Sequence, residues 1–318
     1  MGRTAPGTRD DRRANAHQTE ACYSSASPGD SRAADPPLQS PPVLMADPLT
    51  ISIVTPSFNT GRYLGAAISS VLQQDWPDIE YLVMDGGSSD CTHEVLVGFG
   101  EKIRWISEKD NGQSDAINKG FAKTSGDILA WLNADDEYAP NAVRRATEYF
   151  QAHPDVALVY GNADYIDARG RQIAPCAHIE PFNYHRLLHY SDYIVQPAAF
   201  FRRSAFEAAG GLDASLNWTM DYDLWLKIAR NNQVAYLPEL LAHYRWLDNN
   251  KTATGGRARL DEISRVLASH GAGIPAYVRL EYVNHFLQQA AAGLRQWRIG
   301  SAIANMAQAG GKLFGSHR

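Results

Sequence analysis

From residue 49 onward, the chain alternates between two patterns of apolar and polar positions. Five segments are apolar and rich in β-branched residues, as buried strands are: 49–58, 79–87, 102–110, 127–136 and 156–166. Four segments between them repeat apolar residues at helical spacing: 63–74, 94–100, 112–124 and 140–153. Pro140 opens the last of these, at the helix start that proline prefers. Strands that alternate with helices over short turns predict an α/β fold with a mostly parallel sheet flanked by helices.

The alternation weakens after Gly170. Three later segments differ in pattern: an irregular stretch rich in aromatic residues (181–213), an amphipathic helix (221–232) and extended chain (234–246). Helical patterns then dominate to the end of the chain, with a break at 271–275. We therefore expect one α/β domain over residues 49–256 and a helical C-terminal extension over residues 257–318.

The first 48 residues are rich in Ala, Pro, Ser, Arg and Asp and contain almost no large apolar side chains. Such a segment buries too little surface to offset the entropy lost on ordering, so we expect residues 1–48 to form a disordered tail. Met45 lies just before the first apolar segment and is an alternative translation start. Two interpretations of this segment are equally open: a flexible tail, or a translation start assigned too far upstream.

The composition restricts the class of protein. The 318 residues are 44% apolar, enough for a sizeable core, and the net charge of -5 gives no electrostatic argument for nucleic-acid binding. Three cysteines are too few and too scattered for a disulfide framework or a zinc site. No apolar run approaches the roughly 18 residues that span a bilayer, and no N-terminal segment resembles a signal peptide. We therefore expect a cytoplasmic protein.

Polar clusters follow three of the predicted strands: "TPSFN", "MDGGSSD" and "NADD". Ligands of open α/β sheets bind beyond the carboxyl ends of the strands, so these clusters mark the expected site. The third cluster places Asn133, Asp135, Asp136 and Glu137 directly after an apolar run. Carboxylates this close repel one another, which leaves two interpretations: a solvated turn, or a site where a divalent cation and a nucleotide diphosphate bind.

Three longer segments, in this order, resemble the inverting glycosyltransferases of family 2, which have the Rossmann-like GT-A fold: "SIVTPSFNTGRYLGAAISSVLQQDWPDIEYLVMDGGSSDCT", "NGQSDAINKGFAKTSGDILAWLNADDEY" and "MDYDLWLKIA". The resemblance implies transfer of a sugar from a nucleotide-diphosphate-sugar donor to an acceptor hydroxyl, with inversion at the anomeric carbon. It also implies a glycan or lipid-linked acceptor and a place in polysaccharide or glycoconjugate biosynthesis of the cell envelope.

The resemblance assigns a donor-binding set at the strand ends: Pro56, Ser57, Phe58, Asp85, Asp115, Asn133 and Ala134. In this assignment the Phe58 ring stacks on the base and Asp85 forms a hydrogen bond to it. Both residues have a structural alternative, because Phe58 is also a candidate core residue and Asp85 suits a turn. Ser88 and Asp90 suit a turn and a helix N-cap better than a ligand contact.

The metal ligand is also assigned by the resemblance. The family pattern is Asp-x-Asp, and its last Asp ligates a divalent cation, Mn2+ or Mg2+, that bridges the diphosphate. Here Asn133 stands at the first position and Asp135 at the last, and Asp136 is a further candidate ligand through water. Family members often have a His shortly after "YR", where this chain has Leu247; His243 and Arg245 are the nearby candidates for a diphosphate contact. A structural role for His243 is the alternative.

Asp221 in "MDYDLW" matches the general base of the family, which takes the proton of the acceptor hydroxyl. Asp223 is the rival, and residues two apart on a helix point in different directions, so only one of them faces the pocket. Gln196 lies in a segment that resembles the acceptor side, and Arg202 and Arg203 are either phosphate ligands or solvated.

Two other functions remain as alternatives. An inert nucleotide-sugar-binding subunit would lack the metal and base carboxylates, and a nucleotidyltransferase would need a glycine-rich phosphate loop after the first strand. The basic, partly apolar segment 276–318 predicts either peripheral contact with the cytoplasmic face of the membrane, or packing on the catalytic domain or on a second subunit.

Overall fold

The computed structural model describes residues 49–247, 250–295 and 299–314. The chain divides into two units, Met1–Ala46 and Asp47–Arg318. The first unit, and with it the predicted disorder of residues 1–48, lies outside the described residues.

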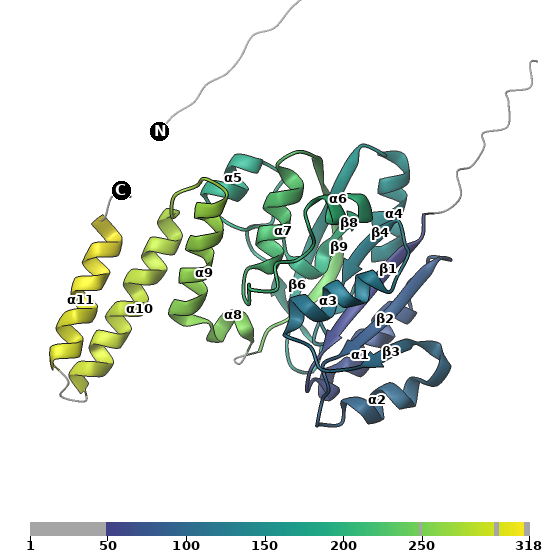
Figure 1. The fold of residues 1–318 in the computed structure, drawn as a ribbon, viewed down its shortest axis with the longest axis horizontal. Coiled ribbons are helices and arrows are strands. Elements are labelled where there is room, and N and C mark those ends of the chain that lie inside the picture. Colours follow the sequence, from purple (N-terminus) through teal and green to yellow (C-terminus); the bar gives the residue numbers. More distant parts are fainter. Residues whose placement is uncertain (1–48, 248–249, 296–298, 315–318) are drawn as a thin grey trace, which may run out of the picture. The chain divides into compact units, whose positions relative to one another are not determined.

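Four parallel strands form one half of the sheet, in the order β3-β2-β1-β4 (Figure 1). They are β1 (Ile51–Ser57), β2 (Ile79–Asp85), β3 (Arg104–Ser107) and β4 (Ile128–Trp131). The register pairs Ser57 with Asp85 and Asp85 with Ser107, so three strands reach the same edge of the sheet with their last residues side by side.

The other half of the sheet is mixed. It consists of β8 (Ala199–Arg202), β6 (Val156–Ile166), β9 (Gln233–Arg245), β5 (Glu137–Tyr138) and β7 (Gln172–Pro175). β8 is antiparallel to both β4 and β6, β6 is parallel to β9, and β5 and β7 pair antiparallel with β9 and β6. The predicted α/β fold is confirmed, and these antiparallel pairings come in addition to the parallel ones that the alternation predicts.

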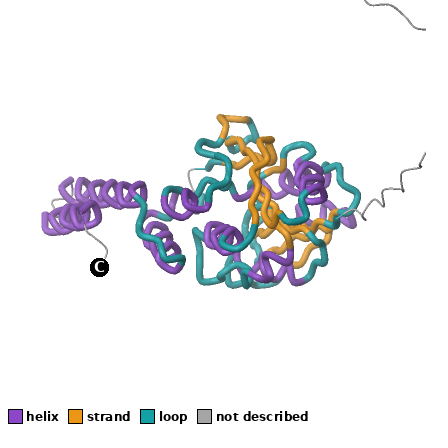
Figure 2. Tube along the Cα trace, turned by 90° about the horizontal axis from the view of Figure 1, so that it is seen from above, coloured by secondary structure: helices purple, strands orange, loops and turns teal. Residues whose placement is uncertain are grey.

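Helices lie on both sides of the strands (Figure 2). The first half of the unit contains α1 (Gly61–Leu72), α2 (Thr92–Phe99), α3 (Gln113–Ala122) and α4 (Ala142–Ala152). The second half contains α5 (Tyr184–His189), α6 (Arg203–Ala208), α7 (Met220–Ala229) and α8 (Lys251–Thr254). The C-terminal helices are α9 (Gly256–Ser269), α10 (Ala276–Arg295) and α11 (Ile299–Phe314). Among the described residues, no helix combines the length and apolar character that a membrane crossing requires.

Most predicted elements occur close to their expected bounds, including the break at 271–275 between α9 and α10. The helix expected from Pro140 begins at Ala142, because Asn141 has a left-handed φ of 64° and is the N-cap. The strand expected over 127–136 ends at Trp131, where the chain turns. The segment expected to be irregular contains β8, a strand too short to show a period.

Two apolar clusters cover the two faces of the parallel strands. Val54, Leu82 and Leu129 contact the cluster that includes Trp225 of α7, whereas their neighbours Ile53, Val83 and Ala130 contact the cluster that includes Leu64 of α1. This is the two-residue alternation of strands that are buried on both faces. Trp131 and Trp225 stack with ring centroids 5.5 Å apart. Leu260, Ile263, Val266 and Leu267 of α9 belong to the first cluster, so this core crosses the predicted domain boundary at residue 256, which stays a prediction.

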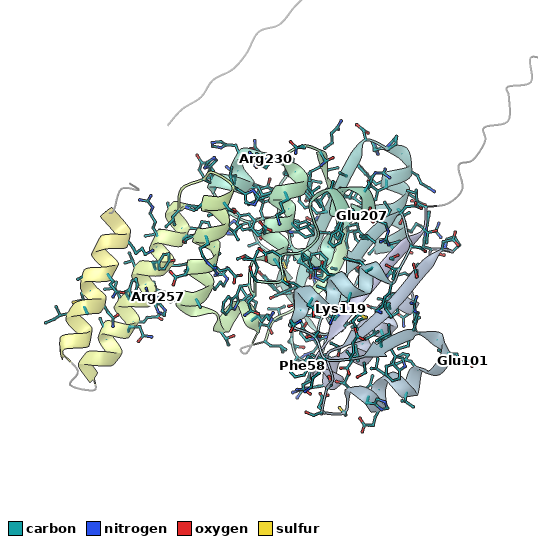
Figure 3. All side chains as sticks on the ribbon, in the orientation of Figure 1. Phe58, Glu101, Lys119, Glu207, Arg230 and Arg257 are labelled. Carbon is teal, nitrogen blue, oxygen red and sulfur yellow. The ribbon has the colours of Figure 1, made fainter. Side chains whose placement is uncertain are left out.

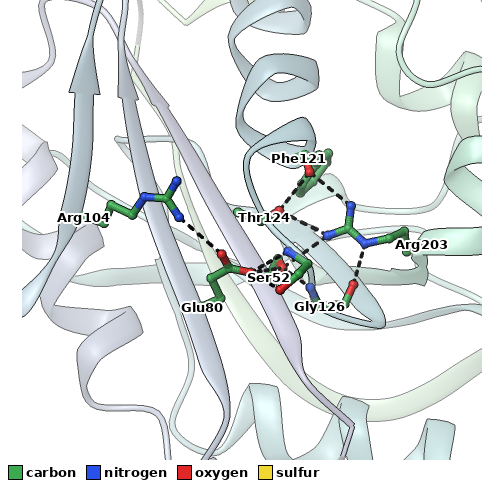
Figure 4. A network of polar contacts seen from close by, with 8 residues as sticks. Ser52, Glu80, Arg104, Phe121, Thr124, Gly126 and Arg203 are labelled. Carbon is green, nitrogen blue, oxygen red and sulfur yellow. Dashed lines mark hydrogen bonds and ion pairs between the residues drawn. The ribbon is translucent and has the colours of Figure 1, made fainter.

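Arg203 anchors the chain at the amino-terminal edge of the parallel strands (Figure 4). Its guanidinium donates to the carbonyls of Gly126, 2.7 Å away, and Phe121, 3.1 Å away. Arg202 likewise donates to the carbonyls of Val156 and Phe150. Both arginines were candidates for a phosphate ligand or for simple solvation, and the structure shows a third role: they hold loops together at the edge opposite to the polar strand ends.

Gly120 of α3 lies directly against β1. A Cβ at this position would come within 2.6 Å of Val54 Cγ1. Gly98 of α2 is also a helical glycine, but nothing lies within 4 Å of a Cβ added at that position.

We predict that Gly120→Ala lowers the free energy of unfolding by about 1–3 kcal/mol, because overpacking of α3 on β1 outweighs the better helix propensity of alanine. Gly98→Ala is the matched control and should raise the stability by up to about 1 kcal/mol. Urea denaturation followed by circular dichroism measures both. Equal effects of the two substitutions would show that α3 can shift away from β1 at no cost.

Candidate active site

Asp85 lies at the shared edge of the parallel strands and is buried, with 3% of its surface exposed. Its carboxylate accepts hydrogen bonds from the hydroxyls of Ser88 and Ser107, both at 2.5 Å, and from the Ser88 N–H. Asp85 therefore stabilises the turn that follows β2, as its structural alternative expects. Contact with a base stays a prediction.

The loops after β1 and β2 are joined into one surface. The Asn59 N–H donates to Ser88 Oγ at 2.8 Å, and Asn59 Oδ1 accepts from the Ser89 N–H at 2.8 Å. Asp90 accepts from the N–H groups of Gly61 and Thr92, both at 3.0 Å, at the starts of α1 and α2. The predicted turn role of Ser88 is thus confirmed, whereas the predicted N-cap role of Asp90 is not, because Cys91 is the N-cap of α2. Asp90 instead binds the first N–H of each helix, and together with the bonds of Asn59 it holds the two predicted donor-binding loops together.

Phe58 is exposed at the end of β1, with 62% of its surface accessible (Figure 3). The alternative that Phe58 belongs to the core is therefore wrong. Pro56 and Ser57, the preceding members of the predicted donor set, are buried in β1, and the Ser57 hydroxyl lies 2.7 Å from that of Thr60. An exposed aromatic face beside a rigid loop suits stacking on a base.

Asp115 lies in the first turn of α3. Its carboxylate accepts from the Asn111 N–H at 2.9 Å and forms an ion pair with Lys119 at 3.0 Å. The Asn111 N–H and the Lys119 ammonium lower the pKa of Asp115. Asp115 thus binds groups of the protein itself, and its place beside the nucleotide stays a prediction.

The amide of Asn133 connects the predicted metal motif to Gln113 at the start of α3 and to Gln196 before β8. Its Nδ2 donates to Asp136 Oδ2 at 3.1 Å and to Gln196 Oε1 at 2.9 Å, and its Oδ1 accepts from Gln113 Nε2 at 2.6 Å. Ala134, which follows it, is buried at 2% exposure. An aspartate could not donate to Gln196 or Asp136, so the departure from Asp-x-Asp gives this turn hydrogen bonds that the family pattern would not.

Asp135 and Asp136 form the acidic turn itself. Asp136 is 1% exposed and accepts from the Arg245 N–H at 2.9 Å, whereas Asp135 is half-buried. Burial raises the pKa of Asp135, and burial together with the Asp135 charge raises the pKa of Asp136 well above its usual value. The solvated-turn interpretation does not fit this burial. Carboxylates held in such a place are the ligands that a hard divalent cation prefers.

Arg245 lies at the end of β9 beneath this turn, and its side chain is buried. Its guanidinium donates to the carbonyls of Asp135 (2.7 Å) and Asp167 (2.6 Å) and forms an ion pair with Glu137. These contacts give Arg245 a role in shaping the acidic turn. The predicted diphosphate contact stays a prediction, and it would require the guanidinium to exchange one of these partners.

The carboxylates of the acidic turn suit a cation that receives only part of its ligands from the protein. In the part of the chain that the structure describes, no three His, Cys, Asp or Glu side chains converge as a complete metal site. Asp135, with Asp136 behind it, would supply one or two oxygens, and Mg2+ or Mn2+ bound to a diphosphate takes the rest from phosphate and water. His243 Nδ1 is buried and has no hydrogen-bond partner among the described residues, so its role stays open to either alternative.

Asp221 and Asp223 point in different directions from the first turn of α7, as predicted. Asp223 is buried and pairs with His270 at 3.0 Å and Lys227 at 2.7 Å. Asp221 is half-buried and lines a pocket of about 190 Å³ with Asp192, Arg259 and Tyr277. Of the two carboxylates, Asp221 is therefore the one available to a substrate.

The surroundings of Asp221 shift its pKa. Burial raises the pKa of Asp221, while Arg259 and Lys251 partly oppose the shift. Asp192, which is exposed, lines the mouth of the same pocket. A larger hollow of about 730 Å³ lies between α5 and the start of α10 and contains none of the predicted site residues. The smaller pocket is therefore the one that contains a predicted site residue, Asp221.

Hydrogen bonds connect the acidic turn to the base side through residues that no sequence pattern marked. Lys251 Nζ donates to Gln113 Oε1 at 3.0 Å and to the Asn217 carbonyl at 3.1 Å. Gln113 in turn donates to Asn133, as described above. Gln113, Lys251 and Asp192 come from α3, α8 and the loop after α5, and their spacing along the chain carries no signal of this proximity.

The chain belongs to glycosyl transferase family 2, whose family model matches residues 52–210. One relative is an uncharacterized glycosyltransferase of Rickettsia typhi, 29% identical over 217 residues that cover 64% of this chain and 66% of that protein. Another is the O-antigen biosynthesis protein RfbC of Myxococcus xanthus, 30% identical over 203 residues that cover 61% of this chain and 16% of that protein. This chain thus spans less than two thirds of the length of these relatives.

Two solved glycosyltransferases share the fold. S. aureus TarS 1–349 in complex with UDP-GlcNAc has a TM-score of 0.56 and 12% identity, covering 84% of this chain and 93% of that chain. The mannosyltransferase PcManGT of Pyrobaculum calidifontis, in complex with GDP-Man and Mn2+, has a TM-score of 0.54 and 17% identity, covering 85% of this chain and 76% of that chain. At these identities the likeness shows the fold, which is GT-A.

The contacts of Asp223 lead to a prediction about stability. Hydrogen bonds to His270 and Lys227 outweigh burial and lower the pKa of Asp223 in the folded chain. Its contribution is therefore present above the unfolded pKa, about 3.9, and is lost as the pH falls through the lower folded value. We predict that Asp223→Asn lowers the free energy of unfolding at pH 7 by about 1–3 kcal/mol and that this difference shrinks below about pH 4.

Urea denaturation from pH 7 down to about pH 2.5 measures this difference, because the loss occurs between the unfolded pKa and the lower folded pKa. Glu207→Gln is the control, because Glu207 is exposed and forms no ion pair or side-chain hydrogen bond among the described residues (Figure 3). A difference for Asp223→Asn that stays constant across the pH range would contradict the charged role of this carboxylate.

Proposed function

We propose that this chain transfers a hexosyl or related sugar from a nucleotide-diphosphate-sugar donor to an acceptor hydroxyl, with inversion at the anomeric carbon. The observation that supports the proposal most is the half-buried Asp221 carboxylate, which lines a pocket while its neighbour Asp223 is paired with protein groups. A single displacement requires one general base and a stabilised leaving group, and it needs no enzyme nucleophile.

In this mechanism the two parts of the site have separate tasks. Asp221 accepts the proton of the acceptor hydroxyl as that oxygen attacks the anomeric carbon from the side opposite to the diphosphate. The exposed Phe58 ring and the loops joined by Asn59 and Ser88 bind the nucleoside part of the donor. Asp192, at the mouth of the pocket, is placed to accept a hydrogen bond from another hydroxyl of the acceptor.

Asp135 would hold a divalent cation, Mn2+ or Mg2+, and Asp136 would support it. When bound, the cation supplies charge neutralisation for the leaving diphosphate. Support comes from the raised pKa values of both carboxylates, which a cation would reverse, and from the Mn2+ in the complex of PcManGT. Lys251 adds a positive charge on the base side of the same hydrogen-bonded chain.

The acceptor and the cellular place follow less directly from the site. Likeness to an O-antigen biosynthesis protein supports a glycan or lipid-linked acceptor in polysaccharide synthesis at the cell envelope. Four apolar side chains of the last two helices are exposed, which suits either peripheral contact with the cytoplasmic face of a membrane or an oligomer: Leu280, Leu287, Ile303 and Met306.

The two alternative functions receive less support. An inert binding subunit would have no reason to keep, in a pocket beside Arg259, an Asp221 carboxylate that forms no ion pair among the described residues. For a nucleotidyltransferase, the turn after β1 contains one glycine, Gly61, and no glycine-rich phosphate loop.

The base assignment is tested by Asp221→Asn, which keeps the shape of the side chain and removes the proton acceptor. We predict a loss of about 10²–10⁴ in the rate of donor hydrolysis or transfer, with donor affinity nearly unchanged. Because the pKa of Asp221 is raised, the acid limb of the wild-type rate profile should lie above the ordinary aspartate value of about 3.9. Asp223→Asn is the matched control, and a larger rate loss in that variant would overturn the assignment.

The metal assignment is tested by Asp135→Ala. Hydrolysis of UDP- and GDP-sugars is measured with and without Mn2+, and the variant should lose at least about 10²-fold in the metal-dependent rate, since the cation stabilises the leaving group. Melting temperature should change little, because burial raises the pKa of this carboxylate in the folded chain. The control is Asp155→Ala, an exposed carboxylate before β6. Full metal-dependent activity in Asp135→Ala would place the cation elsewhere.

A further inference from the structure

Glu262 of α9 is a buried carboxylate that the mechanism above does not use. It is 2% exposed. Its Oε1 accepts from the Trp218 N–H at 2.6 Å, the Thr219 N–H at 2.9 Å and the Thr219 hydroxyl at 2.8 Å. Its Oε2 accepts from the Asn217 N–H at 3.0 Å. One side chain thus accepts from the backbone N–H groups of three consecutive residues.

These three residues lead directly into the helix that carries Asp221. Thr219 is the N-cap of α7, and its side chain forms no capping hydrogen bond within the helix. Its hydroxyl donates to Glu262 instead. The Thr219 carbonyl accepts the first intrahelical bond, from the Asp223 N–H at 2.9 Å. The position of Thr219 therefore fixes the first turn of α7, and Asp221 is the second residue of that turn.

The backbone of Glu262 is held in place because the helix that contains it, α9, packs into the core. Leu260, Ile263 and Val266 of α9 are buried in the same core cluster as Trp225 of α7. The helix that carries Glu262 and the helix that carries Asp221 therefore contribute to one apolar core, and His270 at the end of α9 also pairs with Asp223 of α7 at 3.0 Å. The Glu262 carboxylate reaches from α9 to the segment that precedes α7. A site held by residues whose own positions are fixed by packing keeps its geometry within narrow limits.

The Asn217 segment also joins the donor side of the site. The Asn217 N–H donates to Glu262, while its carbonyl accepts from Lys251, which donates in turn to Gln113 beside Asn133. Displacement of this segment would therefore move Asp221 relative to the acidic turn at Asp135. Catalysis by positioned groups falls steeply with such displacements, since about 1 Å can cost on the order of 10²-fold in rate.

We propose that Glu262 is a positioning residue for the Asp221 base, contributed by the C-terminal helices outside the segment that the family model matches. It acts through the backbone of Asn217, Trp218 and Thr219 and does not touch substrate. The catalytic consequence rests on the proposed function, whereas the hydrogen bonds from residues 217–219 to Glu262 are a property of the fold.

Two substitutions of Glu262 separate the effect of side-chain length from the effect of charge. Glu262→Gln keeps the length and leaves Oε1 able to accept from Trp218 and Thr219, although its amide faces the Asn217 N–H. Glu262→Asp keeps the charge but is one methylene shorter and cannot reach the same three groups. Positioning by hydrogen bonds requires the glutamine variant to be the more active of the two, whereas an effect of charge alone on α7 requires the reverse.

The kinetic experiment uses the full chain with Mn2+ and measures hydrolysis of UDP-GlcNAc and GDP-mannose as probes. We expect Glu262→Ala and Glu262→Asp to lower kcat at least roughly tenfold and Glu262→Gln to stay within roughly threefold, with donor Kd nearly unchanged in all three. Asp261→Asn is the control, because this neighbour on α9 bonds the Tyr282 hydroxyl at 2.6 Å and does not contact the segment. Each variant is assayed below its own melting temperature.

A second measurement does not depend on activity. Hydrogen–deuterium exchange of peptides covering residues 217–222 should be faster in Glu262→Ala and Glu262→Asp than in wild type, and unchanged in Asp261→Asn. Unchanged exchange in Glu262→Ala overturns the hold on the segment. Faster exchange with an undiminished kcat, or full activity of Glu262→Asp with loss in Glu262→Gln, overturns the catalytic role.

The two measurements also separate this proposal from the proposed function. If wild type hydrolyses neither nucleotide sugar, and Asp221→Asn changes nothing, the failure concerns the proposed function as tested with these donors. The exchange measurement then decides by itself whether Glu262 holds residues 217–222. If wild type is active and the Glu262 variants behave as Asp261→Asn does, the proposal fails while the proposed function stands.

Discussion

The parallel pairing of β1, β2 and β3 is the constraint on which the donor side of the site depends. Because the register sets Ser57 opposite Asp85 and Asp85 opposite Ser107, the loops after all three strands begin at one edge of the sheet. A shift by one residue would turn every buried side chain of a strand to the opposite face. The two apolar clusters exclude such a shift, and so the core fixes where the site lies.

The acidic turn shows how the fold holds carboxylates that repel each other. Asp136 receives an N–H from Arg245 and an amide hydrogen from Asn133, and the Arg245 guanidinium binds the backbone of Asp135 from below. These contacts compensate the buried Asp136 more than the half-buried Asp135, whose carboxylate accepts from no other side chain among the described residues. A difference of this kind between adjacent acids suits one ligand and one supporting residue.

The base side is built differently, from contacts made late in the chain. The core cluster that includes Trp225 contains side chains of α9, and Glu262 and Lys251 bind the backbone of Asn217 from two directions. The segment matched by the family model ends at residue 210, before Asp221 and all of these residues. The C-terminal helices therefore form part of the environment of the proposed base.

The sequence by itself determined the parallel half of the sheet, the helices between its strands and the strand ends that carry polar residues, because each of these depends on periodicity and on neighbours along the chain. It also separated Asp221 from Asp223 by the helical repeat, and the structure agrees. Only the tertiary structure decided that β8 enters the sheet antiparallel, that Phe58 is exposed, and that Arg202 and Arg203 bind carbonyls. It alone brought Gln113, Lys251 and Glu262 to the site, because hydrogen bonds between residues 20 to 138 positions apart leave no local pattern in the sequence.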